Sequence, residues 1–352
     1  MNRSDIMGWL RENDSSRLQL LWAAADAVRR AHVGQKVHLR GLVELSNFCR
    51  RDCAYCGIRR GNRTLARYRL SAEAILECAS AAERLGCRTL VLQAGEDAGM
   101  SCDFIERIIR MIRDRSELVV TLSLGEREVD ELARLRRAGA DRYLLRFETS
   151  NIDLLSEIHP AVRQDAPTRL DLLRILRELG YEVGSGVMVG LPGTSYEDLA
   201  TDIEWFRDLD LDMVGVGPFV PHPSTPLAHT TRRLPRGQQV ARTSLMTLKV
   251  MALARLVCPD ANIPVTTALA TVCRHEGLKL GFSCGANVWM PNVTPARARA
   301  QFDIYPGKVS RFGGQEQGIH DVLRGLGRPV ATHRGDRPRY GQQRGRRPSP
   351  AN

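Results

Sequence analysis

Residues 37–57 read VHLRGLVELSNFCRRDCAYCG. The first part, residues 37–45, is an apolar run typical of a buried β-strand, and three cysteines follow it closely: Cys49, Cys53 and Cys56. Three thiolates can hold three irons of a 4Fe-4S cube and leave the fourth iron without a protein ligand. We therefore interpret this stretch as a strand that leads into a cluster-binding loop, which predicts redox chemistry on a small molecule bound at the open iron.

Two other interpretations of the three cysteines stay open at this point. One is a set of unrelated buried thiols. The other is a structural zinc site, although zinc normally takes a fourth ligand from a second Cys or His pair, and the sequence has no further CxxC or HxxxH pair. The other cysteines are scattered singly through apolar segments and are predicted to be packing residues: Cys78, Cys87, Cys102, Cys258, Cys273 and Cys284.

The chain has 352 residues, of which 43% are hydrophobic. That length suits two ordinary domains or one large α/β barrel. The N-terminus is polar, and no apolar stretch is long enough to span a bilayer. We expect a cytoplasmic protein without membrane association, in a compartment where thiols stay reduced.

The formal net charge is +11, and much of the excess lies after residue 323. Residues 324–352 are rich in Gly, Pro and Arg, so we expect a disordered basic tail. Only four of the 51 basic residues are lysines, which indicates an arginine bias along the whole chain. We therefore do not expect nucleic-acid binding.

Strand-like and helix-like patterns alternate along the chain. After an N-terminal helical extension over residues 1–35, with helices near 4–12 and 16–31, short apolar runs are expected to be strands at 37–45, 89–94, 118–124, 142–147, 182–189, 213–220, 263–269 and 287–290. Amphipathic patterns between them predict helices at 71–85, 104–115, 128–138, 168–179, 196–209 and 244–257. Eight strands with helices between them predict an α/β fold, a closed (βα)8 TIM barrel over residues 36–323.

Active sites of such barrels lie at the C-terminal ends of the strands, and polar or glycine-rich residues follow most of the predicted strands. Each of these residue groups has a simple structural explanation when it is considered alone. The sequence from Gly190 to Gly193 suits a turn, Arg146 and Glu148 suit an ion pair on one face of a strand, and His222 suits a loop. Because all these residues are expected at the same end of the barrel as the cysteines, together they favour a functional site.

The cysteine triad with Tyr55 before its last cysteine resembles the signature of radical S-adenosylmethionine (SAM) enzymes. Longer strings resemble, more narrowly, the HydE-type radical maturases of iron-iron hydrogenase, and the resemblance covers about residues 20–310. These strings are residues 39–60, 91–97, 121–126, 141–149, 188–193, 215–223 and 284–292.

The resemblance implies one 4Fe-4S cluster on the three cysteines, with SAM chelating the open iron. One electron from the reduced cluster would then cleave SAM and release a 5'-deoxyadenosyl radical. It places the cofactor contacts on Tyr55, Gly95, Glu96, Ser123, Glu148, Arg169, Gly190 and Gly193. Arg169 would pair with the methionine carboxylate, and Glu148 would accept hydrogen bonds from the ribose or the amino group. It places the substrate pocket on Thr121, Arg146, Thr266, Thr267, Met290 and Tyr305, a set suited to an anionic ligand.

The implied substrate is a cysteine-bound iron complex with carbon monoxide and cyanide, or another small anion, and the implied process is assembly of the di-iron subcluster of the hydrogenase. The implied partners are sister maturases and an electron donor such as a ferredoxin or flavodoxin. Some relatives carry three further cysteines for a second cluster. Residues 309–318 contain none, so we expect no second cluster.

Two rival functions stay open. A related radical enzyme, such as a methylornithine synthase, would act on an amino-acid-like substrate; a biotin synthase is disfavoured because its second cluster needs further cysteines on barrel strands. A non-enzymatic iron-sulfur scaffold would need the cysteines alone, so Ser123, Glu148 and Arg169 argue against it.

Overall fold

The computed structural model describes residues 1–161, 166–230, 234–235, 237–273, 276–308 and 316–338. Two helices precede the sheet, α1 (Arg3–Arg11) and α2 (Ser15–Val33). The side chains of Asn2 and Asp14 cap them by accepting hydrogen bonds from backbone amides of the first turn. Buried Lys249 donates to the carbonyl of Leu10 at 3.1 Å, so α1 is fixed on the body of the protein.

Among the described residues, seven parallel strands form one curved sheet in the order β6-β5-β4-β3-β2-β1-β7. Nearly all of their residues are buried, as expected of a parallel sheet covered by helices. The strands are β1 (His38–Ser46), β2 (Thr89–Ala94), β3 (Val119–Ser123), β4 (Arg142–Leu144), β5 (Glu182–Val189), β6 (Met213–Pro218) and β7 (Val288–Trp289).

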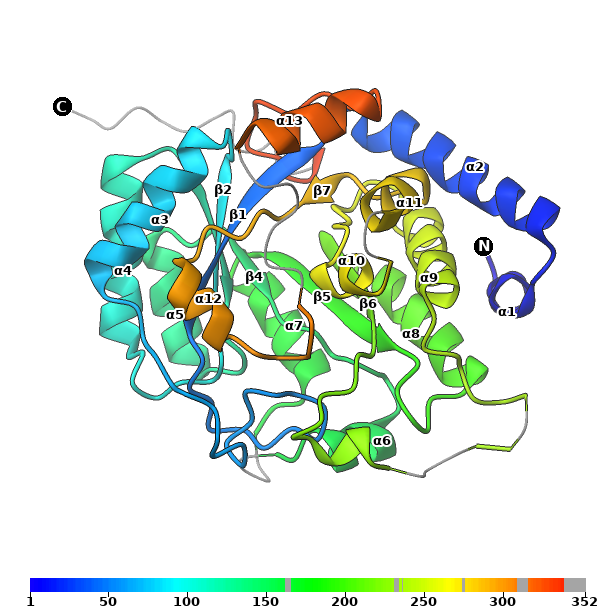
Figure 1. Cartoon of the computed structure of the whole chain (residues 1–352), viewed down its shortest axis with the longest axis horizontal. Helices are drawn as coiled ribbons and strands as arrows, with labels where there is room; N and C mark the ends of the chain where they lie inside the picture. Colours follow the sequence, from blue (N-terminus) through cyan, green and yellow to red (C-terminus); the bar gives the residue numbers. More distant parts are fainter. Residues whose placement is uncertain (162–165, 231–233, 236, 274–275, 309–315, 339–352) are drawn as a thin grey trace.

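The helices alternate with the strands and surround the sheet (Figure 1). The side chains of five residues cap helices by accepting a hydrogen bond from a backbone amide of the first turn: Ser71, Ser101, Thr168, Ser195 and Thr243. The α-helices after α2 are α3 (Ala72–Arg84), α4 (Cys102–Arg115), α5 (Val129–Ala138), α6 (Ile152–Ile158), α7 (Arg169–Glu178), α8 (Tyr196–Asp208), α9 (Ser244–Val257), α10 (Thr267–Cys273), α11 (Gly277–Ser283), α12 (Ala296–Gln301) and α13 (Glu316–Gly325).

The strand predicted at residues 263–269 is wrong. Residues 262–265 form only single bridges, Asn262 to Met213 of β6 and Pro264 to Val288 of β7. Pro264 has no amide hydrogen to give to a ladder, and helix α10 begins at Thr267. The ring of strands therefore closes between β6 and β7 through a short bridging segment instead of an eighth strand.

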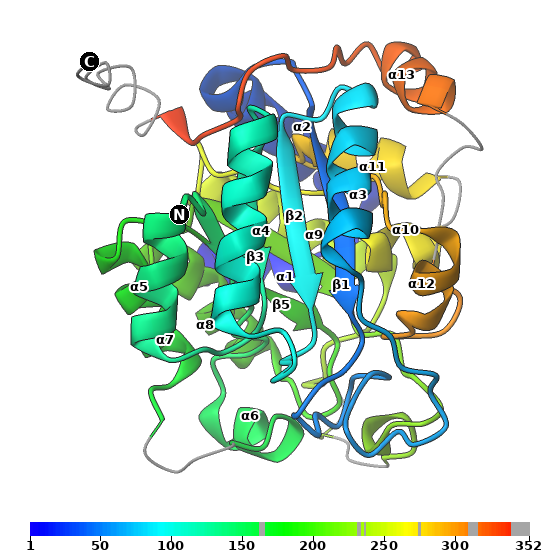
Figure 2. The ribbon, with the colours of Figure 1, turned by 90° about the vertical axis from the view of Figure 1, so that its left-hand side faces the viewer.

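The C-terminal ends of the strands all lie at one end of the fold. Figure 2 shows β1 and β2 running toward the end that carries α6 and the loop after β1, while α13 lies at the opposite end. The cysteine loop is thus on the side where parallel barrels carry their active sites.

The first part of the expected tail packs against the N-terminal end of the strands. Val37 donates to the carbonyl of Pro329 and accepts from Ala331, both at 2.8 Å. Buried Arg337 pairs with Asp212 at 3.1 Å and with Asp260 at 2.5 Å. The structure therefore differs from the expected tail over residues 324–338, residues 339–352 lie outside the described residues, and the division of the chain at residues 35 and 323 stays a prediction.

Among the described residues, no helix combines the length and the apolar character needed to cross a membrane.

Candidate functional site

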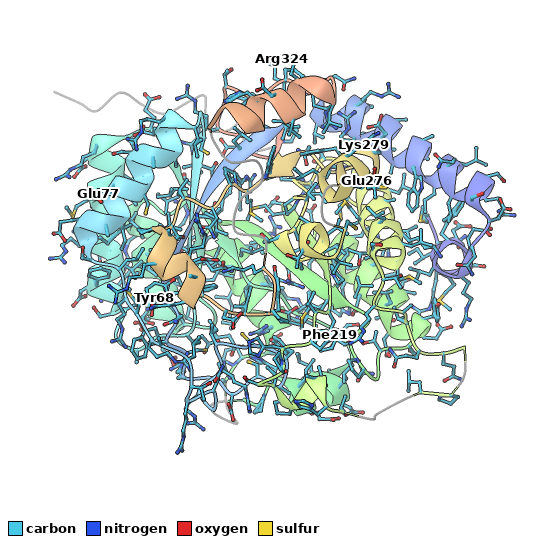
Figure 3. The ribbon with its side chains drawn as sticks, viewed as in Figure 1. Tyr68, Glu77, Phe219, Glu276, Lys279 and Arg324 are labelled. Carbon is cyan, nitrogen blue, oxygen red and sulfur yellow. The ribbon has the colours of Figure 1, made fainter. Side chains whose placement is uncertain are left out.

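A cavity of about 240 Å³ opens at the C-terminal end of the strands. Residues from the loop after β1, from β2 to β6 and from the chain after α12 line it, and Phe219, labelled in Figure 3, lies on its wall after β6. Eleven of the residues predicted from the sequence line this one cavity: Cys49, Cys53, Tyr55, Cys56, Gly95, Glu96, Ser123, Arg146, Glu148, Arg169 and Tyr305.

The three cysteines of the loop are free and lie close together in the wall of the cavity. Burial raises the pKa of Cys53 to about 12, and burial followed by the charges of Cys53 and Cys49 raises the pKa of Cys56. Thiols that oppose each other's ionisation need a strong cation to become thiolates, and iron supplies one. The donor set therefore fits an iron-sulfur cluster. The other six cysteines are buried or half-buried, as predicted for packing residues.

Gly95, at the end of β2, lets the cysteine loop approach the strand closely. A Cβ at this position would lie 2.3 Å from the carbonyl oxygen of Phe48 and 2.8 Å from the Cβ of Cys49. The amide of Arg50 also donates to the carbonyl of Glu96 at 2.9 Å. The end of β2 thus fixes the position of the first cysteine.

An ion-pair network fixes Arg169 at the start of α7. Its Nε donates to Glu126 Oε1 at 2.8 Å, and its Nη1 donates to the carbonyl of Arg146 at 2.6 Å. Glu126 also contacts His159 at 3.0 Å and pairs with Arg51. Burial works against ionisation of Glu126, but the hydrogen bond from His159 and the charges of Arg169 and Arg51 bring its pKa down to about 2. The Arg169 guanidinium is therefore held in one orientation at the cavity wall.

Sequence reasoning missed Arg51, Glu126 and His159. Arg51 and Glu126 lie inside strings that the sequence analysis quotes. The available signal was the presence of two acidic residues at strand ends, Glu96 and Glu126, together with an arginine-rich cysteine loop. Glu96, Glu126 and His159 offer ligand atoms within 4.8 Å of one another, a grouping that could hold a metal ion. Because Arg51 binds both carboxylates, their charge is already compensated and a second cation is disfavoured there.

Glu148 follows β4 and aims a partly unsatisfied carboxylate into the cavity. Its φ of 67° is a left-handed value that glutamate rarely adopts. Its Oε2 lies 3.1 Å from Arg146, yet this buried oxygen accepts no hydrogen bond from the described residues. A ligand with N–H or O–H groups would satisfy it.

Arg146 and Thr121 also carry unsatisfied polar atoms in this part of the barrel. Arg146 donates to the carbonyl of Val187 at 2.5 Å, while its Nε has no hydrogen-bond partner among the described residues. The Thr121 hydroxyl is buried without a partner in the same set and lies two residues before Ser123 on β3, so it belongs to the same face of the strand. Arg146 lines the cavity, whereas Thr121 is not among the lining residues.

Five further predicted residues do not line the cavity. The Thr266 hydroxyl donates to the carbonyl of Val216 at 2.9 Å, Thr267 begins α10, and Met290 follows β7. Gly190 and Gly193 have φ of 82° and 94°. A Cβ at Gly190 would lie 2.4 Å from Cα of Arg242, and Gly193 donates to Gln239, so these glycines pack against residues 239–242. Their roles in ligand binding stay predictions.

The segment 302–308 covers the cavity and brings Phe302, Ile304 and Tyr305 to its wall. Several contacts hold it. Among them, the Gly57 amide donates to the carbonyl of Ile304 at 3.0 Å, His222 contacts Asp303 at 3.1 Å, and Lys308 pairs with Glu44 at 2.8 Å. His222 is thus a loop residue, as its sequence context predicts, and the structure adds its contact with Asp303 of this segment. The cover joins the cysteine loop to β1 and the loop after β6.

Comparison with known proteins gives consistent matches. The model of the radical SAM superfamily matches residues 43–206. Over 300 residues the chain is 44% identical to the FeFe hydrogenase maturase subunit HydE of Thermotoga maritima, covering 85% of this chain and 82% of that one. It is 26% identical to a 3-methylornithine synthase of Methanosarcina acetivorans over 86% of this chain and 82% of that one. The crystal structure of a methylornithine synthase has the same fold, with a TM-score of 0.79 at 23% identity over 94% of both chains.

Proposed function

We propose, from the premise that this chain belongs to the HydE family within the radical SAM superfamily, that it generates a 5'-deoxyadenosyl radical by reductive cleavage of SAM and uses it in hydrogenase maturation. The chain is a radical SAM enzyme. Its proposed substrate is a cysteine-bound iron carbonyl cyanide complex, a precursor of the di-iron subcluster. A single cluster and SAM would be its cofactors, and sister maturases would be its partners.

One observation carries this proposal: three mutually close free thiols share a cavity with an oriented arginine and an unsatisfied carboxylate. Cys49, Cys53 and Cys56 would hold the cluster, which supplies the electron for C–S cleavage when SAM is bound. Arg169, already oriented by Glu126, would bind the methionine carboxylate. Glu148 would accept hydrogen bonds from the amino or ribose groups.

The deeper residues would select the substrate. Arg146 brings a positive charge to the cavity and Tyr305 adds a hydroxyl group to its wall, while the unpartnered hydroxyl of Thr121 would be reached deeper in the barrel. An anion bearing carboxylate and cyanide groups would pair with the guanidinium and accept these hydrogen bonds. Burial raises the pKa of Tyr305, so its hydroxyl stays a donor at neutral pH. The segment 302–308 would keep water away from the reacting groups.

The proposal is tested by anaerobic reconstitution followed by reduction with dithionite in the presence of SAM and one candidate substrate. With the cysteine-bound iron complex we expect 5'-deoxyadenosine to form together with loss of the complex. Turnover of lysine instead would assign the chain to methylornithine-type chemistry. No 5'-deoxyadenosine under any condition, from protein with a full iron load, would support a scaffold that only stores clusters.

A further inference from the structure

The cysteine loop itself is strongly basic. Residues 49–69 contain seven arginines and one acidic residue, Asp52. Arg51 and Arg67 are used inside the protein: Arg51 binds Glu96 and Glu126, and Arg67 donates to backbone carbonyls of the loop, including that of Ile58 at 2.8 Å. These two arginines explain how the loop folds, and they leave five guanidinium groups nearer the surface.

Three of the remaining arginines already have acidic partners. Arg59 pairs with Asp52 at 2.7 Å, Arg69 with Asp97 at 2.7 Å, and Arg50 with Glu96 at 3.3 Å. Arg60 and Arg63 differ from them. Both are exposed, and no hydrogen bond or ion pair of their side chains is found within the part of the chain that the structure describes. Their charges face solvent beside the cluster-binding loop.

The backbone that carries Arg60 and Arg63 is fixed relative to the cysteines. The Arg60 amide donates to the carbonyl of Arg51 at 2.8 Å, between the first and second cysteines. The amide of Gly61 donates to Asp52 at 2.8 Å, and the Asn62 side chain donates to the carbonyl of Gly57 at 2.8 Å. Arg60 is the fourth residue after Cys56, so their Cα atoms are at most about 14 Å apart. A protein that binds these arginines therefore comes close to the cluster site.

We propose that Arg60 and Arg63 form the docking surface for a small acidic protein that carries one electron. We call these two residues the arginine face. The inference rests on the proposed function, which needs one electron per SAM cleaved. The carrier would be oxidised by one electron and the cluster reduced by one, with no bond made or broken and no proton transferred. Charge complementarity would bring the two centres together and set the orientation of the encounter.

A nucleic acid is the less favoured occupant of the arginine face. Single strands bind to basic surfaces that also offer exposed aromatic rings for base stacking. The two tyrosines of residues 49–69 do not offer this. Tyr55 lies in the cavity wall, and Tyr68 donates its hydroxyl to the carbonyl of Glu44 at 2.9 Å. The face provides charge without stacking, which suits an acidic protein.

The test compares two double variants of the reconstituted full-length protein. Arg60→Glu/Arg63→Glu reverses the two unpaired charges, and Lys36→Glu/Arg88→Glu makes the same change in net charge at exposed positions before β1 and β2, at the opposite end of the strands. The first readout is the affinity for a flavodoxin, measured by calorimetry at low and high salt. The second is 5'-deoxyadenosine formation driven by dithionite or by reduced flavodoxin.

We expect Arg60→Glu/Arg63→Glu to weaken flavodoxin binding by about tenfold at low salt and to flatten its salt dependence, because exposed ion pairs contribute modestly and are screened by salt. Flavodoxin-driven cleavage should fall with it, dithionite-driven cleavage should be unchanged, and the control variant should bind within about twofold of the unmodified protein. Unchanged binding, an equal loss in the control, or binding of single-stranded RNA in place of flavodoxin would overturn the docking surface. Failure of dithionite-driven cleavage in the unmodified protein would instead overturn the proposed function.

Discussion

Asp202 on α8 offers a quantitative test of how the loop that carries Glu148 is held. Its carboxylate is buried and accepts a hydrogen bond from the amide of Ser150 at 2.6 Å, two residues after Glu148. Burial raises the pKa of Asp202 to about 7, and the hydrogen bond from Ser150 opposes this only in part. The native protein therefore binds this proton more tightly than the unfolded chain does.

The sign of the effect follows from that difference. Between pH 4 and 7 the unfolded chain has lost the proton and the native state keeps it, so the free energy of unfolding falls as pH rises. A rise from 3.8 to about 7 corresponds to about 4 kcal/mol at most. Asp202→Asn cannot ionise, yet its amide oxygen can still accept from Ser150. We expect the variant to lack this slope and to be the more stable protein at pH 8.

The assay is urea unfolding of the cluster-free protein, followed by circular dichroism between pH 4 and 8. Asp208→Asn is the control, because Asp208 is an exposed carboxylate at the end of the same helix. It should leave the pH dependence unchanged. Parallel pH curves for the unmodified protein and Asp202→Asn, or a large loss of stability in Asp202→Asn at pH 8, would refute the reasoning.

Three further changes test other parts of the structure. Gly95→Ala places a methyl group against the backbone before Cys49. We expect a loss of about 1–3 kcal/mol in unfolding free energy and a lower iron content after reconstitution. A full iron load would contradict the close approach of the cysteine loop to β2. Glu148→Gln keeps the shape of the side chain but removes its charge. The affinity for SAM, measured by calorimetry, should fall about tenfold while the iron content is kept. An unchanged affinity would show that Glu148 does not contact SAM. Arg337→Ala removes an ion-pair partner of fully buried Asp212. Urea unfolding should therefore show a loss of about 3 kcal/mol in the free energy of unfolding. A loss below about 0.5 kcal/mol would show that the C-terminal segment is not needed for stability.

The sequence predicted most of the sheet because buried parallel strands are continuous apolar runs. The expected limits of β2 and β5 match the structure, and α8 and α9 begin at the expected residues, Tyr196 and Ser244. The run at 263–269 misled the prediction because apolar and β-branched residues also begin α10, where the Thr266 hydroxyl accepts from the amide of Leu269 at 3.3 Å. A capping threonine and a strand threonine look alike in sequence.

The candidate site was predicted where the residues lie next to the cysteines or at strand ends. Arg169 and Glu148 line the cavity. The residues that support them from further away come from distant segments. His159, at the end of α6, which has a weak sequence pattern, contacts Glu126, and Asp202, in the middle of α8, accepts from the amide of Ser150. The composition of residues 324–338 predicted disorder, but part of this segment is ordered. Arg334 and Arg337 pair with buried acidic residues that come together at the N-terminal end of the barrel only when the chain is folded.

The central claim is that three cysteines bind a cluster whose open iron takes SAM. The most direct measurement is the electron paramagnetic resonance spectrum of the reconstituted, dithionite-reduced protein with and without SAM. We expect a signal of one reduced 4Fe-4S cluster that changes shape when SAM is added, and no such signal from Cys53→Ala. A spectrum that SAM leaves unchanged, or a cluster signal that survives Cys53→Ala, would contradict it.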